Sequence, residues 1–140
     1  MKILVIDGQG GGIGRAVVAA LKQARPGLRL LALGTNATAT AAMLRAGADQ
    51  GATGENAIRH QCRDAQVIVG VVGLLHFHAL LGEISPAIAA AVSGSAAEKV
   101  LIPLDRCGLH VVGVDPKPLE ALIAEAVEAV LRIADGEPHP

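Results

Sequence analysis

A glycine-rich loop between an apolar block and a helical pattern constrains the fold more than any other feature. The block ILVI runs into Asp7, and five glycines fall within positions 8–14. Ile13, Val17 and Leu21 then recur at four-residue spacing, which is typical of an amphipathic helix. A strand, a tight turn of bare backbone and a helix in this order predict an α/β unit whose main chain can approach a ligand closely.

Continuous apolar blocks recur along the chain and alternate with helical stretches. Runs without polar alternation are typical of strands that are buried on both faces of a parallel sheet. We expect such strands at 2–6, 28–34, 66–73 and 99–104, a short edge strand at 48–53, and helices at 13–24, 37–46, 55–63, 86–93 and 117–134.

This alternation predicts an α/β fold: a three-layer, Rossmann-like, doubly wound and mostly parallel sheet with strand order 3-2-1-4-5-6. The sixth strand is HVVGV at 110–114, which follows the 99–104 block after a link too short for a helix. We therefore expect an antiparallel hairpin at that edge of the sheet. One domain would span 1–136, with a frayed tail at 137–140.

Composition excludes several classes of protein. The net charge is −1, and Phe77 is the only aromatic residue in 140, which argues against a nucleic-acid partner. Cys62 and Cys107 are too few for a disulfide framework, and the longest nearly apolar run, 67–75, is too short for a membrane span. We expect a cytoplasmic protein without a membrane partner. A mean hydropathy of +0.47 favours a homo-oligomer, most simply a dimer.

The glycines fit G-x-x-x-G-x-G, the spacing of the NAD(P)-binding loop in short-chain dehydrogenases. In such a loop a phosphate lies against free N–H groups at the helix N-terminus. The candidate cofactor-binding residues of the loop are Asp7, Gly8, Gly10, Gly11, Gly12, Ile13 and Gly14. The expected ligand is a phosphate-bearing small molecule, either NAD(P) or another nucleotide. The alternative is a structural turn that only packs the strand on the helix.

Two observations argue against a standard dinucleotide site. The second strand ends in Gly34-Thr35-Asn36, without the carboxylate that usually holds the ribose hydroxyls. Asp7 would repel a pyrophosphate, so we expect it to turn inward and accept N–H groups of the loop. The chain has no tyrosine, which excludes the Tyr/Lys chemistry of short-chain dehydrogenases, and no Walker lysine follows the glycines, which excludes a P-loop NTPase.

Polar residues also follow the other strands, and ligands of parallel sheets bind at the carboxyl ends of strands. We add four of them to the candidate cofactor site: Thr35, Asn36, Glu83 and Arg106. Arg106, next to Asp105, would be an anion clamp. For the threonines, including Thr53, and for Asn36 the alternative role is helix capping. Glu55 and Asn56 are weaker candidates at the same edge.

A metal or redox site is a further alternative. His76 and His78 follow the fourth strand, and Cys107 and His110 follow the fifth. Convergence of these side chains could bind Zn²⁺. The H-x-H spacing is a weak signal for a metal site, because His76 and His78 point in the same direction only if the segment is a regular strand. We favour the interpretation that they are ordinary surface histidines. We therefore expect no metal.

In combination, the segments DGQGGGIG, ALGTNATATAAMLRAGA, GATGENAI, LGEISP and PLDRC resemble an uncharacterised family of small bacterial proteins, a domain of unknown function. The resemblance covers about residues 1–130. It implies a Rossmann-like domain and supplies no reaction and no catalytic residue. Three functions remain open: a nucleotide-binding protein, a structural or interaction subunit, and a metal-dependent or redox enzyme that uses His76, His78 and Cys107. Whether the protein is an enzyme is left undecided by the sequence.

Overall fold

The computed structural model of the chain describes residues 1–138. Strands and helices alternate along it. The strands are β1 (Ile3–Asp7), β2 (Leu30–Gly34), β3 (Gln50–Thr53), β4 (Val67–Val71) and β5 (Glu98–Ile102). The helices are α1 (Gly12–Ala24), α2 (Ala37–Arg45), α3 (Glu55–Cys62), α4 (Pro86–Gly94) and α5 (Leu119–Ala134), together with a 3₁₀ turn, η1 (Val72–Leu75).

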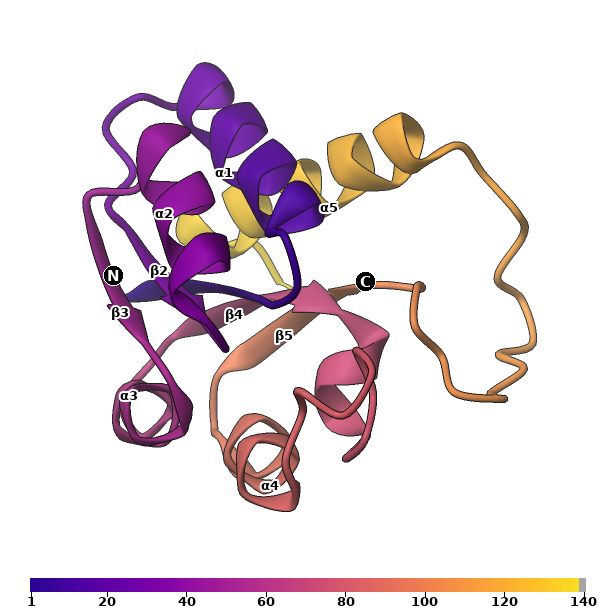
Figure 1. The fold of residues 1–140 in the computed structure, drawn as a ribbon. Coiled ribbons are helices and arrows are strands. Elements are labelled where there is room, and N and C mark those ends of the chain that lie inside the picture. Colours follow the sequence, from indigo (N-terminus) through magenta and orange to yellow (C-terminus); the bar gives the residue numbers. More distant parts are fainter. Residues whose placement is uncertain (139–140) are drawn as a thin grey trace.

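Within residues 1–138 the strands form a five-stranded sheet in the order β3-β2-β1-β4-β5, and every adjacent pair is parallel. Helices α1, α2 and α5 cover one face of the sheet, and α3 and α4 cover the other (Figure 1). The predicted Rossmann-like α/β fold is confirmed at this level, including the short edge strand β3. The carboxyl ends of the strands meet at one edge, which carries the glycine loop.

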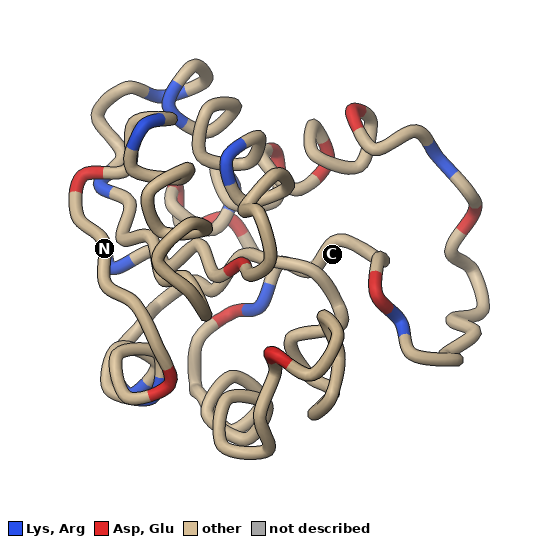
Figure 2. The backbone as a smooth tube through the Cα atoms, viewed as in Figure 1, with Lys and Arg blue, Asp and Glu red and all other residues tan. Residues whose placement is uncertain are grey.

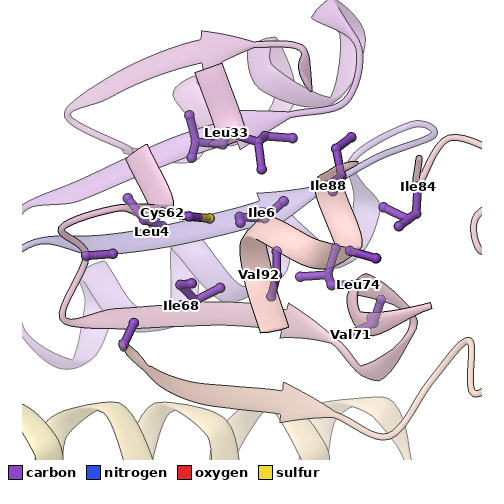
Figure 3. Packing of buried hydrophobic residues seen from close by; sticks show 14 of the residues in the cluster. Leu4, Ile6, Leu33, Cys62, Ile68, Val71, Leu74, Ile84, Ile88 and Val92 are labelled. Atoms are coloured by element: carbon purple, nitrogen blue, oxygen red, sulfur yellow. The ribbon is translucent and has the colours of Figure 1, made fainter. Parts of the chain in front are cut away.

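Each face of the sheet has its own apolar core. Along β1, Ile3 and Val5 belong to the cluster under α1, α2 and α5, whereas Leu4 and Ile6 belong to the cluster under α3 and α4. This alternation follows from the two-residue period of a strand. Figure 3 shows the second cluster, in which branched aliphatic side chains pack together with Cys62. Burial on both faces explains why β1 and β4 read as continuous apolar runs.

The expected antiparallel hairpin at 110–114 is wrong. No strand pairs with the outer edge of β5 among residues 1–138, and residues 103–118 form a long connection without strand structure. Chain geometry supplies the reason. Leu122 of α5 lines the same cleft as Pro103, and Ile133 lines the same groove as Glu98, so α5 runs back along β5 from its carboxyl end.

A full hairpin would leave Val114 beside Glu98, at the wrong end of β5 for entry into α5. The return to Leu119 would cover about 20 Å, given the rise of a strand and the spacing of packed layers. The five Cα–Cα steps from Val114 to Leu119 reach at most about 18 Å. The segment therefore cannot pair fully with β5 of its own chain and still begin α5 where it does.

Two other expectations concern the C-terminal tail and membranes. Helix α5 ends at Ala134, and residues 137 and 138 are without regular structure, while the rest of the expected tail, 139–140, lies outside the described residues. Among residues 1–138, none of the helices combines the length and hydropathy needed to span a bilayer.

The packing predicts that alanine substitution at two glycines in the first turn of α1 affects stability differently. A Cβ atom at Gly14 would lie 2.7 Å from Sδ of Met43 and 2.8 Å from Cβ of Asp7, whereas one at Gly12 would meet nothing within 4 Å. Gly14→Ala should therefore lower the free energy of unfolding by about 1–3 kcal/mol, as overpacked sites do. Gly12→Ala should not lower it. Urea denaturation measures both, and equal stabilities of the two variants would contradict the packing.

Candidate functional site

The glycine loop, residues 8–11, joins β1 to α1 by a tight turn. The N–H of Gly11 donates to the carbonyl of Gly8 at 2.9 Å, and Gly11 has a left-handed backbone with φ of 73°. A Cβ at Gly11 would lie 2.8 Å from the Cα of Ala39 in α2. Bare backbone is thus required here by the approach of α2 as well as by the turn.

Asp7 fastens both ends of this loop. Its Oδ1 accepts the N–H of Gly8 at 2.8 Å, and its Oδ2 accepts the N–H of Gly14 at 2.7 Å. The expectation that Asp7 turns inward to brace the loop is confirmed. Burial raises the pKa of Asp7 above its ordinary value, against the effect of these two N–H donors, and the nearby carboxylates of Asp105 and Glu83 raise it further.

Glu83 reaches the loop from a distant part of the chain. Its Oε1 accepts the N–H of Gln9 at 2.8 Å and the side-chain amide of Asn36 at 3.0 Å, and the hydroxyl of Thr35 also donates to it. Thr35 and Asn36 directly follow β2. The carboxylate that the sequence lacks at the end of the second strand is therefore present in the structure, supplied by a residue 48 positions beyond Thr35.

The hydrogen bonds keep the Glu83 carboxylate ionised. Partial burial acts to raise the pKa of Glu83, but the donors Thr35, the N–H of Gln9 and Asn36 together outweigh it, so the pKa is lowered. An ionised carboxylate that accepts a main-chain N–H and two side-chain donors resembles the way such loops hold an anion. The inner part of the site thus already contains a carboxylate group of the protein itself.

The segment 76–84 holds Glu83 in place through an unusual backbone. His78, Leu80 and Leu81 all have positive φ angles, between 54° and 74°, although none is glycine. The N–H of His78 donates to the carbonyl of Ile84 at 2.7 Å, which closes the segment into a compact turn. Left-handed backbone at several non-glycine residues costs free energy, and such strain is concentrated at functional sites.

Three N–H groups at the end of the loop and the start of α1 have no acceptor in the described chain. The N–H groups of Gly8, Gln9, Gly11 and Gly14 are paired within the protein. Those of Gly10, Gly12 and Ile13 have no acceptor among residues 1–138, and Gly10 and Gly12 are exposed. The N-terminus of α1 therefore presents an outward-facing set of donors to an anion.

Asn36 has two roles, and Thr35 does not have the helix-capping role that was its alternative. The side-chain oxygen of Asn36 caps α2 by accepting the N–H of Ala39 at 2.9 Å, while its amide nitrogen donates to the carbonyl of Gln9 as well as to Glu83. The hydroxyl of Thr35 donates to Glu83 and does not cap a helix. Both residues therefore contact the Glu83 carboxylate.

The other predicted polar residues make no hydrogen bond with the glycine loop in the described chain. Arg106 makes no side-chain hydrogen bond or ion pair within residues 1–138, so its role as an anion clamp stays a prediction. Thr53 pairs with Thr40 of α2 at 2.7 Å, and Glu55 accepts the hydroxyl of Ser85 at 2.5 Å, which ties α3 to α4. Asn56 lines a surface hollow between these two helices.

The histidines and cysteines that the structure describes form no metal-binding group. Among residues 1–138, no three His, Cys, Asp or Glu side chains are grouped closely enough to hold a metal ion. The ring of His78 packs edge-on against Phe77, Cys107 is exposed and Cys62 is buried. Burial raises the pKa of the Cys62 thiol to about 11, which makes it a poor nucleophile.

Sequence reasoning missed Gln9 and Leu80. Gln9, with φ of 50°, contributes its N–H to Glu83 and its carbonyl to Asn36. Leu80 lies over Gly8, where a Cβ would stand 3.1 Å from its Cδ1. A glutamine between glycines carries no side-chain signal, because only its main chain is used.

Removal of the Glu83 carboxylate should loosen the loop. Glu83→Ala leaves the N–H of Gln9 and two side-chain donors without their acceptor. We therefore expect the free energy of unfolding at neutral pH to fall by about 1–2 kcal/mol. Glu137→Ala, at an exposed carboxylate with no such donors, should have little effect.

The same variant has a pH signature. Because the folded pKa of Glu83 is lowered, its stabilisation is present above the unfolded value, near 4.5, and is lost as pH falls through the folded value. The difference between wild type and Glu83→Ala should therefore shrink in acid. Urea unfolding over a pH series measures it, and a difference that grows in acid would contradict this assignment.

Comparisons with known proteins place the chain in a family. None of the curated proteins matches it. Among solved structures it is similar to a dodecameric FMN-dependent UbiX-like decarboxylase from Escherichia coli O157:H7, with 14% identity, a TM-score of 0.44, and coverage of 100% of this chain and 96% of that chain. The family described as a domain of unknown function, DUF3842, matches residues 2–135. The match confirms the resemblance seen in the sequence, and the chain belongs to the DUF3842 family.

Proposed function

We propose that this protein binds a nucleotide, with a phosphate on the outward N–H groups of Gly10, Gly12 and Ile13. NAD(P) is one member of this ligand class. The observation that carries the proposal is that these free donors occur in the same site as a carboxylate, Glu83, which is bonded to Thr35 and Asn36 at the end of β2. Dinucleotide folds use the same two groups, a bare helix N-terminus for phosphate and an acidic side chain at the second strand for ribose hydroxyls.

The hydrogen bonds of Glu83 leave one of its oxygens for a ligand. All three described donors, on Gln9, Thr35 and Asn36, point to Oε1. Oε2 accepts none of the hydrogen bonds found within residues 1–138, and an ionised oxygen of this kind is suited to accept a sugar hydroxyl. The same charge repels a phosphate, so we expect the phosphate on the free donors of Gly10, Gly12 and Ile13 and not beside Oε2.

Internal hydrogen bonds of the loop limit the number of phosphate groups that its N–H donors can bind. Four of the seven N–H groups from Gly8 to Gly14 are already used by Asp7, Glu83 and Gly8. The N–H dipoles and the N-terminus of α1 would help to balance the charge of the ligand. This favours one phosphate group over an extended pyrophosphate. We assign no catalytic residue.

The direct experiment identifies the ligand. Protein purified under native conditions is denatured, and the released small molecules are identified by mass spectrometry. We expect a nucleotide in a fixed ratio to the chain. Calorimetric titration with that nucleotide should then give saturable binding to the emptied protein.

A charge at Gly12 should abolish this binding without unfolding the protein. Gly12 has open space at its Cβ and no positive φ, so Gly12→Asp is tolerated sterically, yet its carboxylate would lie where the phosphate binds. Gly27→Asp is the matched control, because Gly27 has equal space but lies in the turn before β2, at the opposite edge of the sheet. Calorimetry should detect binding to the control alone. Equal affinity of both variants would remove the loop as the site.

A structural or interaction subunit is the second candidate. The internal pairing of Gly8, Gln9, Gly11 and Gly14 is what a structural loop requires. Exposed apolar side chains between β5 and α5 favour association with another copy. Release of no small molecule, together with an oligomeric mass, would select this function over nucleotide binding.

A further inference from the structure

The segment that should have formed the sixth strand is the most exposed part of the described chain. We call residues 105–118, between β5 and α5, the arm. Every residue from Cys107 to Glu120 is exposed, and Figure 1 shows the arm extending away from the sheet before it returns to α5. Its apolar side chains include Val112, which is 99% exposed. Apolar exposure on this scale marks an interaction surface.

Charge is confined to the ends of the arm. Asp105 and Arg106 lie at its start and Asp115 and Lys117 near its end, with none of these charges in the apolar stretch LHVVGV, 109–114 (Figure 2). The stretch is rich in valine, which favours strand structure. The main chain of the arm makes two internal turns, from Leu109 to Arg106 and from Val114 to Val111. The stretch therefore has strand-forming sequence and free main-chain groups.

A cleft, which we call the slot, lies beside the stretch 109–114. The slot, of about 340 Å³, is bounded by Val100–Ile102 of β5 and the following Pro103, by Leu122 and Ala129 of α5, and by Gly113–Asp115 of the arm. One wall is thus the outer edge of β5, which no strand covers within residues 1–138. The slot is mostly apolar, and its polar lining is Asp115 and the ion pair of Lys117 with Glu125. An uncovered strand edge beside such a cleft is a template for a further strand.

Chain length decides which molecule can fill the slot. The arm of the same chain cannot lie along β5 in full, because the remaining residues do not reach Leu119. A second copy carries the same LHVVGV stretch on an arm free of that constraint. We propose that the stretch 109–114 of a second copy adds a strand to the outer edge of β5, and that the two copies exchange arms reciprocally. Association of this kind does not depend on whether the glycine loop binds an anion.

The test measures molar mass by light scattering during size exclusion, over a dilution series. Wild type should have at least twice the chain mass of 14.2 kDa. Val112→Asp should be monomeric, since it places a charge on the added strand, and its full exposure means that the fold is retained. Leu81→Asp is the matched control: Leu81 is 96% exposed outside the arm, its φ of 56° suits aspartate, and this variant should stay associated.

A cross-link distinguishes the exchange from other arrangements. In a Cys107→Ser background, Val100→Cys and Val112→Cys in the same chain are treated with a short bis-maleimide, while buried Cys62 stays unreactive. The expected product has twice the chain mass. A monomeric wild type, an unchanged mass for Val112→Asp, or an internally linked chain of single mass would each overturn the proposal.

Discussion

The carboxylate of Asp7 is the interaction on which the site depends. It lies at the end of β1 and accepts the first and the last N–H of the glycine run, so it determines where the loop begins and where α1 starts. Burial of a carboxylate is costly, which is why its pKa is raised, and the two main-chain donors offset part of that cost. The tight contact of Gly14 with Asp7 and Met43 then fixes α1 against the sheet.

This brace divides the loop into two faces. On the inner face, Gln9 and the residues after β2 surround the Glu83 carboxylate. On the outer face, N–H groups of Gly10, Gly12 and Ile13 remain without acceptors in the described chain. A loop of this type attracts anions, and here the protein provides one of its own while leaving a second set of donors available. A ligand of the proposed kind would lie beside Glu83 and leave the contacts of Asp7 in place.

The two edges of the sheet differ in a way that bears on assembly. At one edge, β3 is a short strand, and Thr53 at its end is tied to Thr40 of α2 by side-chain hydrogen bonding. At the other, β5 is bordered by a cleft, and the chain length keeps the arm of the same chain from pairing with β5 in full. An open edge beside an apolar, uncharged segment is an association hazard unless a defined partner covers it. Reciprocal exchange would satisfy both elements at once.

The sequence alone determined the elements, their order and the position of the glycine loop, because apolar periodicity and glycine placement are local properties of the chain. It also indicated the inward role of Asp7, a residue adjacent to the groups that it binds. Tertiary structure decided the rest. The approach of Glu83 to Thr35 joins residues 48 positions apart, and no local pattern encodes which distant carboxylate meets which strand end. The failure of the hairpin at 110–114 is equally non-local: the segment has strand-forming residues, but the position of α5 relative to β5 sets a distance that its own chain cannot span.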